Sequence, residues 1–311
     1  MFLQIAILLL GLLMVIGGAN YLVDGASSVA RRTGISEFVI GLVIVGFGTS
    51  LPELVVSVTG AISHNSDIAV GNVIGSNVFN TCLILAISAM VAPLAITRQN
   101  KFRDIPLTIL VTFLVILMGK YGGLSRLEGI ILLVLFALYI FYCFRTDSVE
   151  AVEDSEPAKK LPVFLSWLMI VGGLAALIFG GRLFVQSAEK IARMIGVSDK
   201  FIAITVLAMG TSLPEFITSI VALVKKRSQL ALGNILGSNV FNLLLILGTS
   251  AVIFPTSFAR IDVYDYVALL LSIILVWTGI YTGKKNILDR FDASLMLLVF
   301  AAYMTKLFIT L

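Results

Sequence analysis

Two identical hexapeptides contain the residues best suited to chemistry in this sequence. Each reads Gly-Thr-Ser-Leu-Pro-Glu, at Gly48–Glu53 and again at Gly210–Glu215. Of the eighteen acidic residues, only Glu53 and Glu215 fall in the middle of long apolar stretches. A carboxylate in apolar surroundings is costly unless it faces a wet or protein-lined cavity and has a partner. Neither glutamate has an obvious Lys or Arg partner at similar depth, so a bound cation is the natural substitute.

The residues before each glutamate supply further oxygen. Because Pro52 and Pro214 lack an amide hydrogen, they leave the carbonyls of Gly48 and Gly210 without a helical hydrogen bond. Hydroxyl groups lie at the same two breaks, on Thr49, Ser50, Thr211 and Ser212. The alternative is that each proline only kinks its helix. The adjacent hydroxyls favour a site that binds cations through oxygen.

A second identical hexapeptide, Gly-Ser-Asn-Val-Phe-Asn, occurs at Gly75–Asn80 and Gly237–Asn242. Its serine and last asparagine are four residues apart and share a helix face, at Ser76 and Asn80 and at Ser238 and Asn242. The asparagines could instead form hydrogen bonds between helices. Carboxylate, amide, hydroxyl and backbone oxygens without sulfur or imidazole form a ligand set for a hard cation such as Ca²⁺. Two glutamates would balance one Ca²⁺.

The elements that must position these residues are predicted to cross a membrane. The sequence is 59% hydrophobic and only 13% charged, whereas a soluble domain carries roughly a quarter of its residues as charge. Apolar runs long enough to cross a hydrocarbon core of roughly 30 Å as helices occur at 2–23, 37–62, 68–94, 104–120, 126–145, 162–187, 199–224, 229–254, 263–282 and 291–310. The predicted fold class is therefore an all-α membrane protein with ten transmembrane helices.

The chain is an internal duplication. Shifting the sequence by 162 positions superimposes both pairs of hexapeptides without a gap. The copies are predicted at 1–145 and 162–311, joined by an acidic cytoplasmic linker at 146–161. Because each copy holds five spans, the second copy enters the membrane from the opposite side. Such inverted five-helix repeats place both motifs at one central site, as in many secondary transporters.

Charge and composition predict the orientation and exclude other classes of protein. With both termini outside, fourteen of the twenty-two Lys and Arg residues lie in inside loops, as the positive-inside rule requires. We expect a multi-pass protein of the cell (inner) membrane, with the lipid bilayer as its surroundings and no evident obligate protein partner. No basic-aromatic array indicates nucleic acid. An intramembrane enzyme would need a nucleophile and base or an acid pair, and the single histidine, His64, falls in a predicted loop.

These motifs resemble those of the sodium/calcium exchanger family within the cation/calcium exchanger superfamily, of the prokaryotic type without a large regulatory loop. The resemblance implies that spans two, three, seven and eight surround the ions, while spans one and six slide to switch access. It implies no cofactor, only transported Ca²⁺ and Na⁺. Carried over by position, the ligands would be Glu53, Glu215, Thr49, Ser50, Thr211 and Ser212. Flanking Na⁺ sites would use Ser76 and Ser238, and backbone carbonyls would come from Gly46 and Ala208. Asn80 and Asn242 would complete the middle of the binding site.

One position departs from the family pattern. Many of these exchangers have an aspartate where this chain has Asn242, so the fixed charge comes from the two glutamates alone. One Ca²⁺, two Na⁺ or two H⁺ would neutralise such a site, whereas a third Na⁺ would bury an unbalanced charge. The expected function is antiport of Na⁺ against Ca²⁺ by alternating access. The alternatives are exchange of Ca²⁺ or another cation against H⁺ on the same fold, and an ion channel with uncoupled flux.

Overall fold

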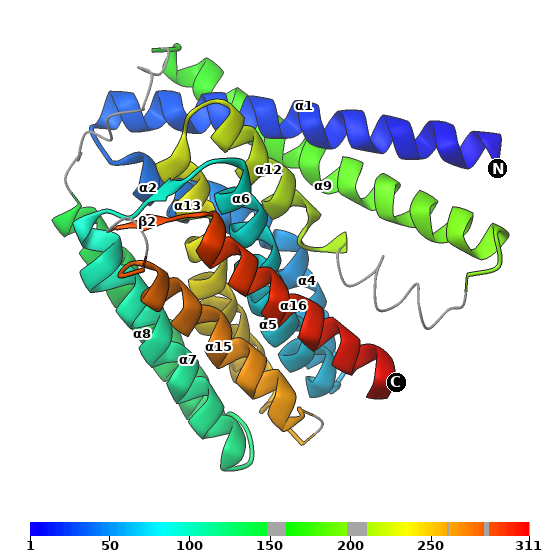
Figure 1. Cartoon of the computed structure of the whole chain (residues 1–311), viewed down its shortest axis with the longest axis vertical. Helices are drawn as coiled ribbons and strands as arrows, with labels where there is room; N and C mark the ends of the chain where they lie inside the picture. The colour runs from blue at the N-terminus through cyan, green and yellow to red at the C-terminus, as the bar shows by residue number, and fades with distance from the viewer. Residues whose placement is uncertain (148–159, 198–209, 260, 283–285, 311) are drawn as a thin grey trace.

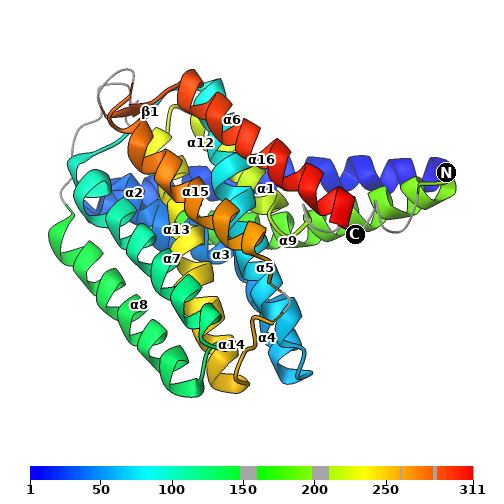
Figure 2. The same cartoon turned by 60° about the horizontal axis from the view of Figure 1, so that its bottom comes forward.

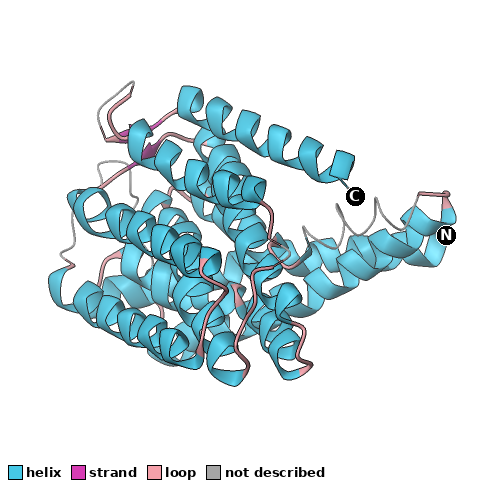
Figure 3. Ribbon diagram, turned by 90° about the horizontal axis from the view of Figure 1, so that it is seen from below, coloured by secondary structure: helices cyan, strands magenta, loops and turns pink. Residues whose placement is uncertain are grey.

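Helices dominate the computed structural model, which describes residues 1–147, 160–197, 210–259, 261–282 and 286–310 (Figures 1 and 3). Seven helices in this part of the chain are long and apolar enough to cross a membrane, at Phe2–Thr33, Ser66–Val91, Asn100–Lys120, Arg126–Thr146, Val163–Met194, Ser228–Ile253 and Arg290–Ile309. An eighth span results if Glu37–Thr49 and Leu51–Ile62, bent by 50°, count as one. The protein is therefore a multi-pass membrane protein.

The ten-span prediction is matched in part. Two predicted spans coincide with shorter apolar helices, Leu213–Val224 and Val263–Gly279. The first half of the predicted span at 199–224 lies outside the described residues. The predicted linker at 146–161 also lies mostly outside them. The count of ten and the inverted topology therefore stay predictions.

In the first half of the chain the elements are α1 (Phe2–Thr33), α2 (Glu37–Ile40), π-helical η1 (Gly41–Gly46), α3 (Phe47–Thr49), α4 (Leu51–Ile62), α5 (Ser66–Phe79), π-helical η2 (Asn80–Leu85), α6 (Ala86–Val91), β1 (Leu94–Ala95), π-helical η3 (Asn100–Asp104), α7 (Ile105–Lys120) and α8 (Arg126–Thr146). In the second half they are α9 (Val163–Met194), α12 (Leu213–Val224), α13 (Ser228–Val240), π-helical η5 (Phe241–Ile246), α14 (Leu247–Ile253), α15 (Val263–Gly279), β2 (Ile287–Leu288) and α16 (Arg290–Thr310).

The two longest helices, α1 and α9, lie antiparallel against each other and extend beyond the rest of the bundle (Figures 1 and 2). Glycines allow this close approach. A Cβ added at Gly18 would lie 2.7 Å from the carbonyl oxygen of Gly173, and the reverse contact is also 2.7 Å. Gly11 and Gly180 form the equivalent pair, with 2.8 Å and 2.9 Å. The 162-residue shift exchanges these two pairs, so α1 and α9 pack symmetrically.

The bundle exposes many large apolar side chains on its outside, unlike a water-soluble protein. The most apolar window of the span that contains α13 is 94% buried, against 22% for α8. Leu127, Ile130 and Leu138 on α8 are large apolar side chains with most or about half of their surface exposed. Polar side chains, in contrast, are buried along α13, including Asn234 and Ser238. An apolar exterior around a polar centre is the arrangement expected for a helical bundle in lipid.

The structure contains a small sheet that the all-α prediction lacks. β1 pairs antiparallel with β2, with Leu94 opposite Leu288 and Ala95 opposite Ile287. The ladder joins the two halves of the chain, and the ammonium group of Lys101 donates to Asn286 Oδ1 across the same junction at 3.0 Å. The fold is mostly helical, as predicted, and this ladder was not predicted because two residues per strand are too few to produce a recognisable alternation.

Three contacts hold the start of α2, which leads to the first hexapeptide. Ser36 is its N-cap, and its hydroxyl accepts from the amide of Val39 at 3.1 Å, the usual way to satisfy a free amide at a helix start. The same hydroxyl donates to the carboxylate of Asp147. Glu37 forms an ion pair with Arg227 at 3.0 Å. The segment before the candidate site is thus held by both halves of the chain.

Candidate ion-binding site

Each Gly-Thr-Ser-Leu-Pro-Glu hexapeptide forms a helix break. The break falls at Ser50 (φ −83°, ψ 5°) and at Ser212 (φ −88°, ψ 5°), so the two backbones have nearly the same conformation. α4 and α12 begin directly afterwards, with Pro52 and Pro214 in their first turns. Proline is tolerated there because the first amides of a helix have no intrahelical acceptor. The predicted interruption is seen before Glu53, where α3 ends at Thr49 and α4 begins at Leu51. Before Glu215, the residues that precede Gly210 lie outside the described residues.

Both glutamates lie in the first turn of the new helix and are buried, with exposed fractions of 1% for Glu53 and 0% for Glu215. Each carboxylate is bound by a serine of the other repeat. The hydroxyl of Ser212 donates to Glu53 Oε1 at 3.2 Å, and that of Ser50 donates to Glu215 Oε1 at 3.0 Å. The structure therefore brings the two hexapeptides together as a reciprocal pair. The N-terminal end of a helix also stabilises a negative charge.

Two asparagines outside the repeated hexapeptides, Asn72 and Asn234, join the breaks to the neighbouring helices. Asn72 donates to the carbonyl oxygen of Glu53 at 3.1 Å and to Ser57 Oγ at 2.9 Å. Asn234 donates to the carbonyl oxygen of Glu215 at 3.2 Å and to a serine hydroxyl, that of Ser219, at 2.9 Å. These bonds join α5 to α4 and α13 to α12 in the same way in both halves.

Four acceptor oxygens in this region have no donor in the described part of the chain. They are the second carboxylate oxygens, Oε2 of Glu53 and of Glu215, and the amide oxygens, Oδ1 of Asn80 and of Asn242. All four residues are at most 1% exposed. Buried acceptors without a donor are costly, so each is expected to have a partner other than the described residues. A hard cation meets this need for carboxylate and amide oxygens together.

π-helical turns occur next to the predicted ligands, a feature that the sequence analysis missed. η1 ends at Gly46, η2 begins at Asn80, and η5 contains Asn242 as its second residue. Single π-helical turns inside α-helices are rare and frequently lie at functional sites. No sequence signal found them because the apolar residues around Asn80 and Asn242 fit either helix period.

The other predicted ligands are less uniformly arranged. Ser238 and Thr49 are fully buried, and their hydroxyls donate to Gly46 O at 3.5 Å and to Asn234 Oδ1 at 3.1 Å. Ser76 and Thr211, their counterparts under the 162-residue shift, line a cavity instead. Ala208 lies outside the described residues. One side of the candidate site is therefore sealed by protein, and the other side is accessible.

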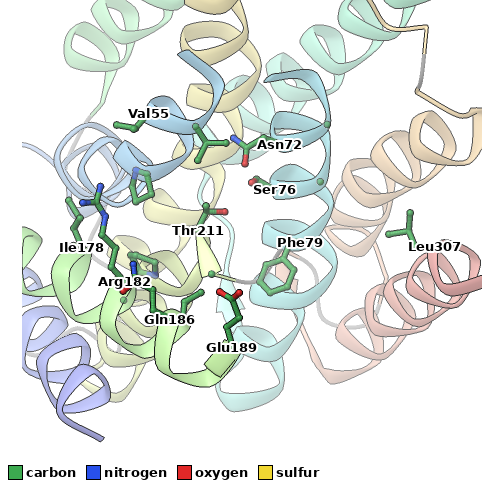
Figure 4. A pocket seen from close by; sticks show the side chains of 18 of the residues that line it. Val55, Asn72, Ser76, Phe79, Ile178, Arg182, Gln186, Glu189, Thr211 and Leu307 are labelled. Atoms are coloured by element: carbon green, nitrogen blue, oxygen red, sulfur yellow. The ribbon is translucent and has the colours of Figure 1, made fainter. Parts of the chain in front are cut away.

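The cavity has a volume of about 610 Å³ and lies between α4, α5, α9 and α16. Ser76 and Thr211 face it from α5 and from the break before α12 (Figure 4). Opposite them, α9 contributes Arg182, Gln186 and Glu189 (Figure 4). The cavity extends from these side chains on α9 to Pro52 and Pro214, the residues directly before the two glutamates.

The fold and the site define a class of protein. Interrupted helices that meet at the centre of a multi-pass bundle, with buried carboxylates and free acceptor oxygens, are typical of secondary transporters. The family model described as sodium/calcium exchanger protein matches residues 3–145 and 165–309. The chain belongs to this family, as its motifs predicted, and is a membrane antiporter.

Individual relatives and solved structures agree with the family. A protein named CaxA from Alkalimonas amylolytica is 36% identical, with 96% of this chain and 97% of that protein covered. Sodium/calcium exchanger MaX1 from Methanosarcina acetivorans is 29% identical, with 97% of each covered. The solved structure of the sodium-calcium exchanger NCX_Mj soaked with 10 mM Na⁺ and zero Ca²⁺ has a TM-score of 0.85 at 29% identity and covers 98% of both chains.

Proposed function

We propose that the chain exchanges Na⁺ for Ca²⁺ across the membrane by alternating access at one central site. The observation that carries this proposal is the reciprocal glutamate pair. Glu53 and Glu215 are each bound by the opposite repeat through one oxygen, and each keeps a second oxygen without a donor. Those two oxygens, with Oδ1 of Asn80 and Asn242, are the ligands that we assign to the transported cation. Because Ca²⁺ and Na⁺ would use the same glutamates, they would bind in turn.

The remaining ligands follow from their positions. Gly46 would supply a carbonyl oxygen on the sealed side, where the hydroxyl of Ser238 already contacts it at 3.5 Å. Ser76 would supply a hydroxyl at the inner end of the cavity, where a hydrated ion can reach it. The hydroxyls of Ser50 and Ser212 donate to the carboxylates, so each keeps lone pairs for a cation. Thr49, Thr211 and Ala208 complete the assignment. Thr49 and Thr211 are equivalent under the 162-residue shift, and Ala208 is equivalent to Gly46.

We further propose ten spans arranged as inverted repeats, with both termini outside the cell (inner) membrane. The loop charge asymmetry of the sequence supports this orientation. The cavity residues Glu189 and Leu307 lie near the C-terminal ends of α9 and α16. In this topology the cavity opens to the outside, and the described state is the one that exchanges ions with the external medium.

Coupling to Na⁺ is tested by Ca²⁺ uptake into proteoliposomes at equal pH on both sides, with a protonophore present. We expect uptake when the vesicles are loaded with Na⁺ and none when they are loaded with choline. The two glutamates account for coupling because two Na⁺ neutralise the same charge as one Ca²⁺. Uptake driven by a pH gradient in the absence of Na⁺ would replace this proposal with Ca²⁺/H⁺ exchange, for which two protons on Glu53 and Glu215 would serve equally well. Equal, uncoupled flux under all conditions would indicate a channel.

Replacing Asn242 with Asp tests the charge argument. The variant adds a third carboxylate to the site, so three Na⁺ rather than two would neutralise it. We expect the wild type to exchange without net charge movement and the variant to move one charge per cycle, measured as a current when vesicles on a solid support are switched between Ca²⁺ and Na⁺. Asn65→Asp is the matched control, since Asn65 is an exposed helix N-cap where Asp serves equally well. An unchanged current in Asn242→Asp would reject the argument.

A further inference from the structure

One face of α9 forms a charged wall of the cavity. Arg182, Gln186 and Glu189 follow at spacings of four and three residues, so they share that face, and all three line the cavity with Ser76 and Thr211 (Figure 4). Among the described lining residues, Glu189 is the only carboxylate and Arg182 is the only cation. None of the ligands assigned above lies on α9, so this wall has no role in the proposed function.

The corresponding face of α1 has a different role. The 162-residue shift places Asn20, Asp24 and Ser27 at the positions of Arg182, Gln186 and Glu189. Lys225, at the end of α12, forms an ion pair with Asp24 at 2.6 Å and donates to the carbonyl oxygen of Asn20 at 3.1 Å. This face of α1 is therefore held by an ion pair to the end of α12.

The first repeat lacks a lysine at the position that would make the equivalent contact with α9. The position equivalent to Lys225 is Ser63, which has no charge. Its hydroxyl donates to carbonyl oxygens of its own helix, those of Thr59 at 2.6 Å and Gly60 at 3.2 Å. The wall formed by Arg182, Gln186 and Glu189 therefore faces the cavity rather than a neighbouring helix.

The carboxylate of Glu189 can contact a cation that enters the cavity. Its described ion pair is with Arg193, four residues later on the same helix, at 3.1 Å, and the side chain of Arg193 is 50% exposed. Exposed pairs of this kind are weak and are screened by salt. The nearby carboxylate of Asp265 is occupied, because the hydroxyl of Tyr303 and the amide of Asp262 donate to it. Glu189 is thus the one carboxylate on the described cavity wall that can contact a hydrated cation.

We propose that Glu189 is a recruiting residue that concentrates cations in the cavity and favours Ca²⁺ over Na⁺ before either reaches the glutamate pair. This inference rests on the proposed function. The field of a charge acts on a divalent ion twice as strongly as on a monovalent ion. The factor by which it changes the local concentration of Ca²⁺ is therefore the square of the factor for Na⁺. One elementary charge beside a water-filled path changes the local concentration of Na⁺ by roughly threefold and that of Ca²⁺ by roughly tenfold at low ionic strength. Arg182 on the same wall opposes this effect.

The test is the initial rate of transport by Glu189→Gln in right-side-out and inside-out membrane vesicles. We expect the KM for Ca²⁺ to rise roughly tenfold and the half-saturating Na⁺ concentration roughly threefold, with kcat unchanged, in only one vesicle orientation. Added choline chloride should shrink both effects, because it shortens the range of the field. Arg182→Gln should lower the KM for Ca²⁺ in the same orientation, and Glu189→Asp should restore the wild-type value.

A fall in kcat without a change in KM, or equal effects in both orientations, would show that Glu189 only supports the structure and would overturn the inference. So would an unchanged KM for Ca²⁺ in Glu189→Gln. Failure of the proposed function is a separate result, because it would appear as absent Na⁺-driven uptake by the wild type. Failure of the inference alone leaves wild-type exchange intact.

Discussion

Glu53→Gln and Glu215→Gln are each expected to reduce Ca²⁺ transport to background while the protein still folds. Glutamine has nearly the same shape as glutamate, and its amide oxygen can still accept from Ser212 or Ser50. It removes one of the two charges assigned to Ca²⁺, so the bound ion would leave a net positive charge buried. Removing one partner of a buried charge pair costs about 3 to 5 kcal/mol, which corresponds to a loss of binding of at least roughly 100-fold.

The measurement is Ca²⁺ uptake into Na⁺-loaded proteoliposomes, together with the yield and thermal unfolding of each variant in detergent. Glu128→Gln is the matched control. Glu128 is half-buried and forms a capping box with Ser125 at the start of α8, where Gln serves as well as Glu. We expect this control to transport normally. Near-normal transport by either Glu53→Gln or Glu215→Gln would show that the central-site assignment is wrong.

Gly233→Ala is expected to destabilise the protein strongly, whereas Gly71→Ala should not, although the two positions are equivalent in the repeats. A Cβ at Gly233 would clash with the carbonyl oxygen of Phe38 and would lie 3.0 Å from the amide nitrogen of Leu42. A Cβ at Gly71 would meet nothing within 4 Å, because that face of α5 lines the cavity. Overpacking a core typically costs about 1 to 3 kcal/mol, and here the contact is with backbone, which cannot rotate away.

Thermal unfolding of the two variants in the same detergent checks this prediction. Gly71→Ala should be neutral or stabilising by up to roughly 1 kcal/mol, since alanine favours the helix. Each variant is the other's control because the chemical change and the helix position are the same. Equal destabilisation by both substitutions would contradict the asymmetry between the sealed side and the open side of the site.

Much of the site could be predicted from the sequence because its polar residues stand alone in apolar surroundings. Glu53 and Glu215 were identified by the cost of burying charge in a membrane, and their partnership by the shared 162-residue shift. Those arguments need no coordinates. The sequence does not reveal that Asn72 and Asn234 bind the backbone of the glutamate turns, because these bonds form between neighbouring helices.

Other features could not be predicted because they depend on contacts between distant segments. The serine that binds each glutamate comes from the opposite repeat, about 160 residues away (165 and 159). The π-helical turns at Asn80 and Asn242 add one residue to a turn without changing the apolar pattern. The sheet between β1 and β2 is too short to produce a pattern of its own.

The sequence by itself determined the family, the membrane location and the two carboxylates, since hydropathy and charge burial act on each residue wherever its neighbours lie. Two identical motifs, however, contain no information about which of them faces water. Only the tertiary structure decided that Gly233 and Ser238 are sealed while Gly71 and Ser76 line a cavity. The physical reason is that one arrangement of packed helices closes a single side of the site, so equal sequences are placed in unequal surroundings.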